Sequence, residues 1–196
     1  MEIHDQLFQG NNIILAPIDH ENDAVIEAKW TEDPEFLSMI STQPVRPLAA
    51  AQVKKKYEQI EKKSAEERDL FYFTIRPKGE SESAAPRLIG FAKIEWIDWT
   101  NGNGLISLGI GDKADRQHGY GTEALQMLIH FAFTELNLFR LSAQIPEYNL
   151  AAHNLFTNFG FVEEARRRGS LNRGGSRWDY VFYGLLRSEW KENINE

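Results

Sequence analysis

The stretch Arg116-Gln117-His118-Gly119-Tyr120-Gly121-Thr122 decides the fold of this chain. It lies between a strand-like run at residues 105–111 and an apolar helix predicted over residues 122–136. Two glycines at the start of a helix let the backbone approach a ligand closely. The N–H groups of the first helical turn and the helix dipole then form an anion site, to which Arg116 adds a positive charge. The stretch therefore predicts a cradle for a pyrophosphate group.

The composition is that of a globular protein, because apolar residues make up 42% and charged residues 26% of the chain. The length of 196 residues suits one domain with a sizeable core, so we expect a single domain over residues 1–196. The chain has no cysteine, which excludes disulfides and thiolate metal sites. Its five histidines show no ligand spacing, so we expect no metal site.

Charge and targeting signals narrow the class further. The formal net charge of −7 argues against non-specific nucleic-acid binding and is compatible with a cationic substrate. The N-terminus lacks a basic region before an apolar run, so no signal peptide is predicted. No apolar run approaches the length of a membrane span. We therefore expect a soluble cytoplasmic protein with neither nucleic acid nor membrane as a partner.

Hydrophobic patterning and turn residues predict an alternation of strands and helices. Asp19 is expected to cap the first helix, residues 33–35 to end it, and residues 77–86 to form a surface loop. The run Asn-Gly-Asn-Gly at residues 101–104 is typical of a hairpin. Strands are predicted over residues 12–18, 70–76, 88–99, 105–111, 139–145, 161–171 and 176–186, and helices over residues 19–31, 49–66, 122–136 and 149–159.

Four interpretations of the glycine-containing stretch compete at this point. A P-loop needs G-x-x-x-x-G-K-[ST], which the chain lacks. A dinucleotide site is a more serious alternative, because Gly119-x-Gly121-x-x-Ala124 matches its short fingerprint and Glu147 follows the next strand. Against it, residues 112–118 separate the strand from the glycines, and only one strand–helix–strand unit is available. Coenzyme A is a third ligand, and a surface turn that binds nothing is the fourth interpretation.

A second motif follows about thirty residues later, Asn149-Leu150-Ala151-Ala152-His153-Asn154-Leu155-Phe156-Thr157-Asn158-Phe159-Gly160-Phe161. With it the chain resembles the GNAT superfamily of acetyl-coenzyme-A-dependent N-acetyltransferases, whose motifs are R/Q-x-x-G-x-G/A and N-x-x-A-x-x-[LFV]-Y-x-x-x-G-F. The resemblance covers roughly residues 12–187. The N-terminal half, with Trp30 and residues 33–35, resembles the branch that contains ribosomal-protein and spermidine acetyltransferases.

The resemblance implies an α/β domain with a mixed central sheet of about seven strands and about four flanking helices. It also implies that two parallel strands splay apart to admit the pantetheine arm of acetyl-coenzyme A. Gly109 and Gly111 suit a close backbone approach, although they can equally mark a bulge, and Asn149 can equally be a plain helix cap. The residues expected to bind the coenzyme are Leu108, Gly109, Ile110, Arg116, Gln117, His118, Gly119, Tyr120, Gly121, Thr122, Asn149, Asn154 and Phe156.

The chain departs from the family pattern at Phe156, where the family usually has the tyrosine that protonates the departing thiolate. A phenyl ring has no proton to donate, so catalysis would depend on positioning the two substrates, with water or another group as the acid. Tyr148, Ser142 and Ser107 are candidate substitutes. Each can equally be a structural residue of a loop or strand.

Two carboxylates on an aromatic strand, Glu95 and Asp98, are the candidates for a catalytic base. Strict alternation would place Glu95 with Ile97 on one face and Asp98 with Trp96 on the other. Solvated carboxylates are the simpler interpretation of both. Asp33 and Glu35, near Trp30, could instead bind a cationic substrate or merely end a helix around Pro34.

The predicted function is therefore acetyl transfer from acetyl-coenzyme A to a primary amine, on a protein N-terminus or a cationic small molecule. A coenzyme-A-binding module without efficient catalysis is the alternative suggested by Phe156, and a dinucleotide-binding protein is a remoter one. The chain could also form a homodimer. The arginine run at residues 166–168 and the side chain of His153 are expected to be solvated.

Overall fold

The computed structural model describes residues 7–79 and 86–190. Most of the loop expected over residues 77–86, and the N-terminal segment in which no signal peptide is predicted, lie outside the described residues. The helices are α1 (Asp23–Trp30), α2 (Pro34–Ile40), α3 (Ala50–Glu67), α4 (Tyr120–Thr134) and α5 (Leu150–Asn158), with a short 3₁₀ turn at Lys113–Asp115. The strands are β1 (Ile13–Ala16), β2 (Phe71–Pro77), β3 (Gly90–Asp98), β4 (Asn103–Ile110), β5 (Arg140–Pro146), β6 (Val162–Arg173) and β7 (Ser176–Leu186).

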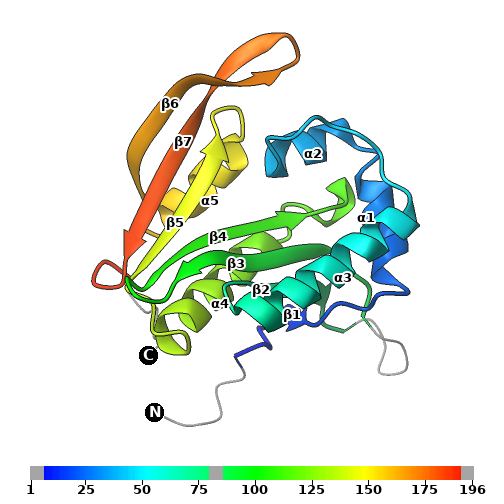
Figure 1. Cartoon of the computed structure of the whole chain (residues 1–196), viewed down its shortest axis with the longest axis horizontal. Coiled ribbons are helices and arrows are strands. Elements are labelled where there is room, and N and C mark those ends of the chain that lie inside the picture. The colour runs from blue at the N-terminus through cyan, green and yellow to red at the C-terminus, as the bar shows by residue number, and fades with distance from the viewer. Residues whose placement is uncertain (1–6, 80–85, 191–196) are drawn as a thin grey trace.

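The strands form one mixed seven-stranded sheet in the order β1-β2-β3-β4-β5-β7-β6 (Figure 1). All neighbours are antiparallel except β4 and β5, which are parallel. The expected sheet is therefore confirmed. The described residues contain five α-helices instead of about four, because residues 34–40 form α2. The Asp33 side chain accepts a hydrogen bond from the Glu35 amide, and Pro34 occupies the first turn, so the predicted helix breaker also starts a helix.

The parallel strands β4 and β5 are paired for only three residues, where Asn103–Leu105 lie beside Arg140–Ser142. Beyond that point both strands continue, β4 to Ile110 and β5 to Pro146, without pairing to each other. Figure 1 shows the two arrows meeting at one end and separating toward the other. The facing backbone edges are therefore free to bind something other than a strand.

The main core lies between the sheet and α4. Leu125, Leu128 and Ala132 are fully buried there, because their spacing places them on one face of the helix. Burial of each such leucine contributes about 1.5–3 kcal/mol. A smaller apolar cluster around Val53 and Tyr57 joins α3 to α1. Within the described residues, no helix is both long enough and apolar enough to cross a membrane.

A bulge in β3 changes the face on which its last residues lie. The pairing with β4 shifts between Glu95 and Asp98, and Trp96 has a φ of 53°. The extra residue brings both Ile94 and Ile97 into the core, whereas Glu95 stays on the opposite face. The prediction that Glu95 and Ile97 share a face is therefore wrong, because strict alternation does not continue through a bulge.

Two other predictions are corrected. The first helix begins at Asp23 instead of directly after Asp19. The Asp19 carboxylate accepts hydrogen bonds from the amides of Glu21 and Asn22 in the turn before the helix. His153 is not solvated as expected. Its Nδ1 lies 2.7 Å from the Tyr183 hydroxyl and its Nε2 lies 3.1 Å from a carbonyl of β5, so the ring ties α5 to the sheet.

Gly111, expected to lie against the coenzyme or to mark a bulge, packs directly against Trp30. A Cβ atom built on Gly111 would lie 2.0 Å from the indole ring. Trp30 in turn packs edge-on against Phe36 of α2, with 5.8 Å between ring centroids. The missing side chain of Gly111 therefore sets how closely α1 and α2 approach the end of β4.

Two glycine-to-alanine substitutions should have opposite effects on stability. We expect Gly111→Ala to destabilise the protein by about 1–3 kcal/mol, because the added methyl group overpacks the site. At Gly121, the new Cβ would meet only ordinary contacts at 3.8 and 3.9 Å, so Gly121→Ala should be neutral or stabilising by about 0.4–1 kcal/mol. Urea denaturation of both variants would measure this, and equal midpoints would contradict the proposed packing role of Gly111.

Candidate active site

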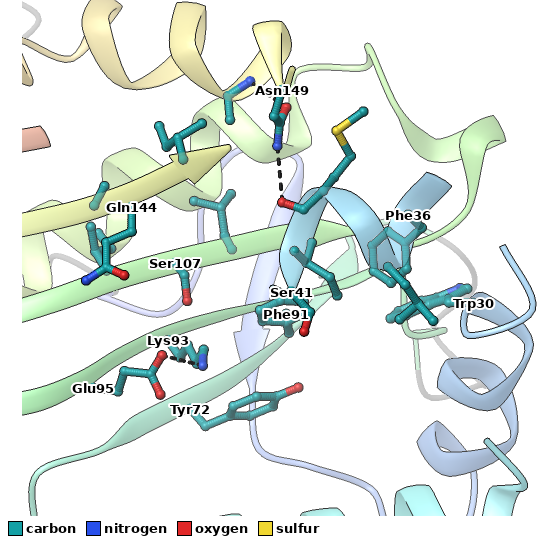
Figure 2. A pocket seen from close by; sticks show the side chains of 18 of the residues that line it. Trp30, Phe36, Ser41, Tyr72, Phe91, Lys93, Glu95, Ser107, Gln144 and Asn149 are labelled. Carbon is teal, nitrogen blue, oxygen red and sulfur yellow. Dashed lines mark hydrogen bonds and ion pairs between the residues drawn. The ribbon is translucent and has the colours of Figure 1, made fainter. Parts of the chain in front are cut away.

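A cavity of about 370 Å³, here called the central cavity, opens where β4 and β5 separate. Its floor is formed by β2, β3 and β4, β5 and α5 line one side, and α1, α2 and α3 contribute the remaining walls (Figure 2). Aromatic rings make up much of the wall, among them Trp30, Phe36, Tyr72, Phe91 and Phe156. The cavity can therefore enclose a largely apolar group beside a few polar ones.

Three polar side chains form a row across the floor of the central cavity. Strand pairing places Tyr72 beside Lys93, and Lys93 beside Ser107. The Lys93 ammonium lies 2.5 Å from a Glu95 oxygen, and the Ser107 Oγ is buried with no partner among the described residues. Figure 2 shows Lys93, Glu95 and Ser107 directed toward the same space. An unpartnered buried hydroxyl is costly, so the Ser107 Oγ is a candidate contact for a bound ligand.

The carboxylates of the central cavity are both neutralised. Glu27 accepts hydrogen bonds from the Lys56 ammonium and the Tyr57 hydroxyl, each at 2.5 Å. Burial raises the pKa of Tyr57 above its usual range, and the Glu27 charge raises it further. Glu95 is paired with Lys93. The lining therefore has two lysines and two glutamates and carries no surplus charge.

The amides of residues 117–122 form a second feature, here called the amide cradle. None of these N–H groups has a backbone or side-chain acceptor within the described residues. Gln117 and Gly119 adopt positive φ angles of 65° and 82°, which bend the chain into the start of α4. A Cβ at Gly121 would have ample room, so packing within the protein does not explain that glycine. Free amides at a helix start, beside a space reserved by glycine, fit a pyrophosphate group.

The loop before the amide cradle is held by charged side chains. Arg87 binds buried Asp115 through two hydrogen bonds, of 2.7 and 2.6 Å. Arg116, expected to supply charge to the pyrophosphate, donates to the carbonyls of Ile110 and Gly111 at 3.3 and 2.7 Å. Arg116 thus fixes the loop to the end of β4. Sequence reasoning missed this role because a motif indicates a residue type without showing which hydrogen bonds it makes.

The start of α5 is tied to α2 through two predicted site residues. The Asn149 side chain accepts the Ala152 amide at 3.1 Å, so it caps the helix, and its Nδ2 donates to the Met39 carbonyl at 3.3 Å. Asn149 also lines the central cavity (Figure 2). The Tyr148 hydroxyl donates to the Ser38 carbonyl at 2.8 Å and lies outside the lining. The structure therefore does not place Tyr148 as a substitute acid.

Phe156 lies in the wall of the central cavity, packed edge-on against Phe161 at 5.0 Å between centroids. Of the two serines considered as substitute acids, Ser107 lines the cavity and Ser142 does not. The remaining predicted coenzyme residues lie as follows. On β4, Leu108 lines the cavity, Gly109 faces Phe91 and Ile40, and Ile110 packs against the core. The rings of His118 and Tyr120 stack with 5.7 Å between their centroids. Asn154 is exposed on α5.

The other candidate carboxylates lie outside the central cavity. Asp98 is exposed at the end of β3, where it accepts hydrogen bonds from the Asn101 side chain and amide. These bonds lower the pKa of Asp98. Asp33 and Glu35 are both near the Lys113 ammonium, at 3.7 and 2.5 Å. The lining of the central cavity therefore has no unpaired carboxylate that could bind the expected cationic substrate.

The dinucleotide interpretation also fails on topology. The sheet contains a single parallel pair, β4 and β5, instead of the repeated parallel units that such a fold requires. Glu147, considered as a ribose ligand, accepts the Asp179 amide at 2.9 Å and lies 3.5 Å from Arg166. These contacts hold Glu147 against β7 at the end of β5, which accounts for its position without a ligand.

Comparison with known proteins supplies the family. The uncharacterized N-acetyltransferase p20 of Bacillus licheniformis is 31% identical over 106 residues, which are 53% of this chain and 57% of that protein. The chain matches about half the length of the curated relatives. Two solved structures superpose with a TM-score of 0.75. They are spermidine N-acetyltransferase from Vibrio cholerae in complex with CoA and spermine (17% identity, 92% of this chain, 98% of that one) and ribosomal-protein-S5-alanine acetyltransferase from Vibrio fischeri (20%, 94%, 98%).

At these identities the two structures show a shared fold, and the sequence pattern is more specific. The model of the family described as acetyltransferase (GNAT) domain matches residues 12–162, which is most of the chain. That segment contains the amide cradle, the diverging strands and the Asn149 motif. The chain therefore belongs to the GNAT acetyltransferase family.

Proposed function

We propose that this protein transfers an acetyl group from acetyl-coenzyme A to a primary amine. The observation that carries the proposal is the amide cradle, a row of free N–H groups beside two strands that part to form the central cavity. Membership of the GNAT family supports the same reaction. Relatives named for ribosomal proteins and for spermidine support an amine as the acceptor.

The residues present fit coenzyme A. The amide cradle would hold the pyrophosphate, and the unpaired edge of β4 at residues 108–110 would bind the amides of the pantetheine arm. Bound there, acetyl-coenzyme A supplies an activated thioester. Ser107 and Phe156 would then lie near the acyl end, because both line the cavity between the parted strands.

The reaction needs a neutral amine, a new N–C bond and a protonated leaving group. Glu95, the one carboxylate in the cavity floor, would accept the proton of the acceptor ammonium. The amine then attacks the thioester carbonyl carbon, the C–S bond breaks, and the sulfur leaves as a thiolate. The proton that the acylated nitrogen loses in this step balances the proton that the thiolate takes up from water or a hydroxyl. The Ser107 hydroxyl is a donor available to the developing oxyanion or thiolate, whereas Phe156 can only position the substrates.

A valine at position 121 should weaken coenzyme binding by about a hundredfold. Its branched side chain would fill the space above the amide cradle, and losing two charge-assisted hydrogen bonds costs about 3 kcal/mol, or roughly a hundredfold in Kd. Ala51→Val is the matched control, because it places the same side chain at the exposed second residue of α3. Titration calorimetry with coenzyme A would measure both, and unchanged binding by Gly121→Val would refute the cradle.

Removing the proposed base should slow the reaction without affecting coenzyme binding. We expect Glu95→Gln to lower kcat/KM for the amine by about a hundredfold, a typical contribution of one general base. Asp98→Asn is the control, because Asp98 lies outside the cavity on the same strand, and it should change the rate less than about twofold. Thiol release from acetyl-coenzyme A with a panel of amines would show both effects. Equal rates in the two variants would exclude Glu95 as the base.

Restoring the family's tyrosine tests how catalysis proceeds. Phe156→Tyr should keep or increase turnover, because it adds a proton donor at little change in volume. The fold should survive, since the cavity beside residue 156 leaves room for a hydroxyl. If wild type and Phe156→Tyr both bind acetyl-coenzyme A but release no thiol with any amine, the protein is a coenzyme-A-binding module.

A further inference from the structure

The distal part of the β6–β7 hairpin is basic, although the whole chain has a net charge of −7. Residues 167–177 contain four arginines, Arg167, Arg168, Arg173 and Arg177, and no carboxylate. None of the four forms an ion pair with a described residue, whereas neighbouring Arg166 contacts three carboxylates. The hairpin therefore presents positive charge that the protein itself does not neutralise.

This positive charge borders a cleft, here called the arginine cleft. Its lining includes Arg167, Ser170 and Arg173 from the hairpin and Thr42 and Pro44 from the α2–α3 loop. Arg173 closes one end by donating to the carbonyls of Ser41 and Gln43 at 2.8 and 2.7 Å. Figure 1 shows the hairpin rising beyond β5 toward the side occupied by α2. Leu171, Asn172 and Tyr180 of the hairpin strands complete the wall, and no carboxylate is among the lining residues.

The arginine cleft adjoins the central cavity, because neighbouring residues line the two. Ser41 lines the central cavity and the next residue, Thr42, lines the arginine cleft. Pro146 and Tyr180 are paired across β5 and β7, and they line the central cavity and the arginine cleft respectively. Burial raises the pKa of Tyr180, the Glu95 charge raises it further, and Arg167 opposes the shift. Tyr180 therefore experiences a charge from each of the two linings, Glu95 from the central cavity and Arg167 from the arginine cleft.

Arg167 is prepared to bind an anion. Its guanidinium lies over the Phe182 ring, 4.7 Å from the centroid, which orients the planar group. The side chain is exposed and has no carboxylate partner within the described residues, so its donors can form a bidentate contact with an incoming carboxylate. A polyamine would find no free carboxylate to bind its ammonium groups in the central cavity, since both carboxylates there are already paired with lysines.

We infer that the acceptor is a peptide N-terminus followed by acidic residues, with its amine in the central cavity and a carboxylate on Arg167 in the arginine cleft. This inference rests on the proposed acetyl transfer and names its acceptor class. The apolar walls of the central cavity accommodate the first side chain of the peptide, and the basic hairpin selects acidic side chains at the second and third positions. The same charge would disfavour spermidine and lysine-rich peptides.

The test compares pentapeptides that differ only at the second and third positions, which are glutamates, glutamines or lysines. Thiol release would be followed at about 0.15 M salt, where the Debye length is about 8 Å, with free glutamate and spermidine as further acceptors. We expect the glutamate peptide to have a kcat/KM about tenfold above that of the glutamine peptide. Arg167→Gln should reduce this advantage to less than about twofold through KM, and Arg167→Lys should keep part of it. Arg168→Gln, which removes the same charge outside the cleft lining, should retain it.

The outcomes separate this inference from the proposed function. Turnover of some amine without an acidic preference, or a preference for spermidine, would overturn the inference and leave acetyl transfer standing. Free glutamate turned over as well as the glutamate peptide would show that a single carboxylate suffices and would overturn the peptide assignment. If no amine releases thiol, acetyl transfer itself fails, and calorimetric titration of the peptides into the coenzyme A complex still tests the cleft. A short RNA that binds more tightly than the glutamate peptide, and loses binding in Arg167→Gln, would assign the hairpin to nucleic acid instead.

Discussion

The site depends on one constraint, the brief pairing of the parallel strands β4 and β5. They share three residues and then part, because β4 remains paired with β3 while β5 remains paired with β7. The two halves of the sheet thus diverge from a common point. Backbone groups along the gap have no strand partner, and unpaired polar groups in an enclosed space favour a ligand that can satisfy them. The amide cradle at the start of α4 likewise presents unpaired N–H groups, here at a helix terminus instead of a strand edge.

The wall opposite the gap is built from contacts between distant parts of the chain. The short helix α2 carries Phe36 and is held by hydrogen bonds from Tyr148 and Asn149, and Arg173 holds the residues that follow it; all three donors are more than one hundred residues away in sequence. Arg116 and Trp30 hold its other end against the close of β4. Several predicted catalytic or binding residues therefore serve to fix the shape of the cavity. Such positioning is itself a contribution to catalysis, since misplaced substrates react slowly.

Charge is distributed differently in the central cavity and in the adjoining arginine cleft. In the central cavity each glutamate is paired with a lysine, which leaves a balanced and largely aromatic enclosure. In the arginine cleft the guanidinium groups have no carboxylate partner among the described residues. Complementarity of charge contributes more to selection and encounter than to raw affinity. An acidic protein with a basic hairpin can thus select a class of acceptor that its net charge would not suggest.

The sequence by itself determined the fold class, the seven strands, the helix that follows the cradle and the position where the usual tyrosine is Phe156. These features are local, since periodicity, turn residues and glycine-containing motifs act over a few residues. Only the tertiary structure decided what the candidate side chains do. The bulge at Trp96 turns Ile97 into the core and away from the face of Glu95, the indole of Trp30 explains Gly111, and a hydrogen bond to α2 holds Tyr148 outside the cavity. The sequence alone likewise did not show that Glu95 pairs with Lys93 or that Arg167 has no carboxylate partner among the described residues. Each depends on which distant groups folding brings within a few ångströms, and the order of residues along the chain does not encode that distance directly.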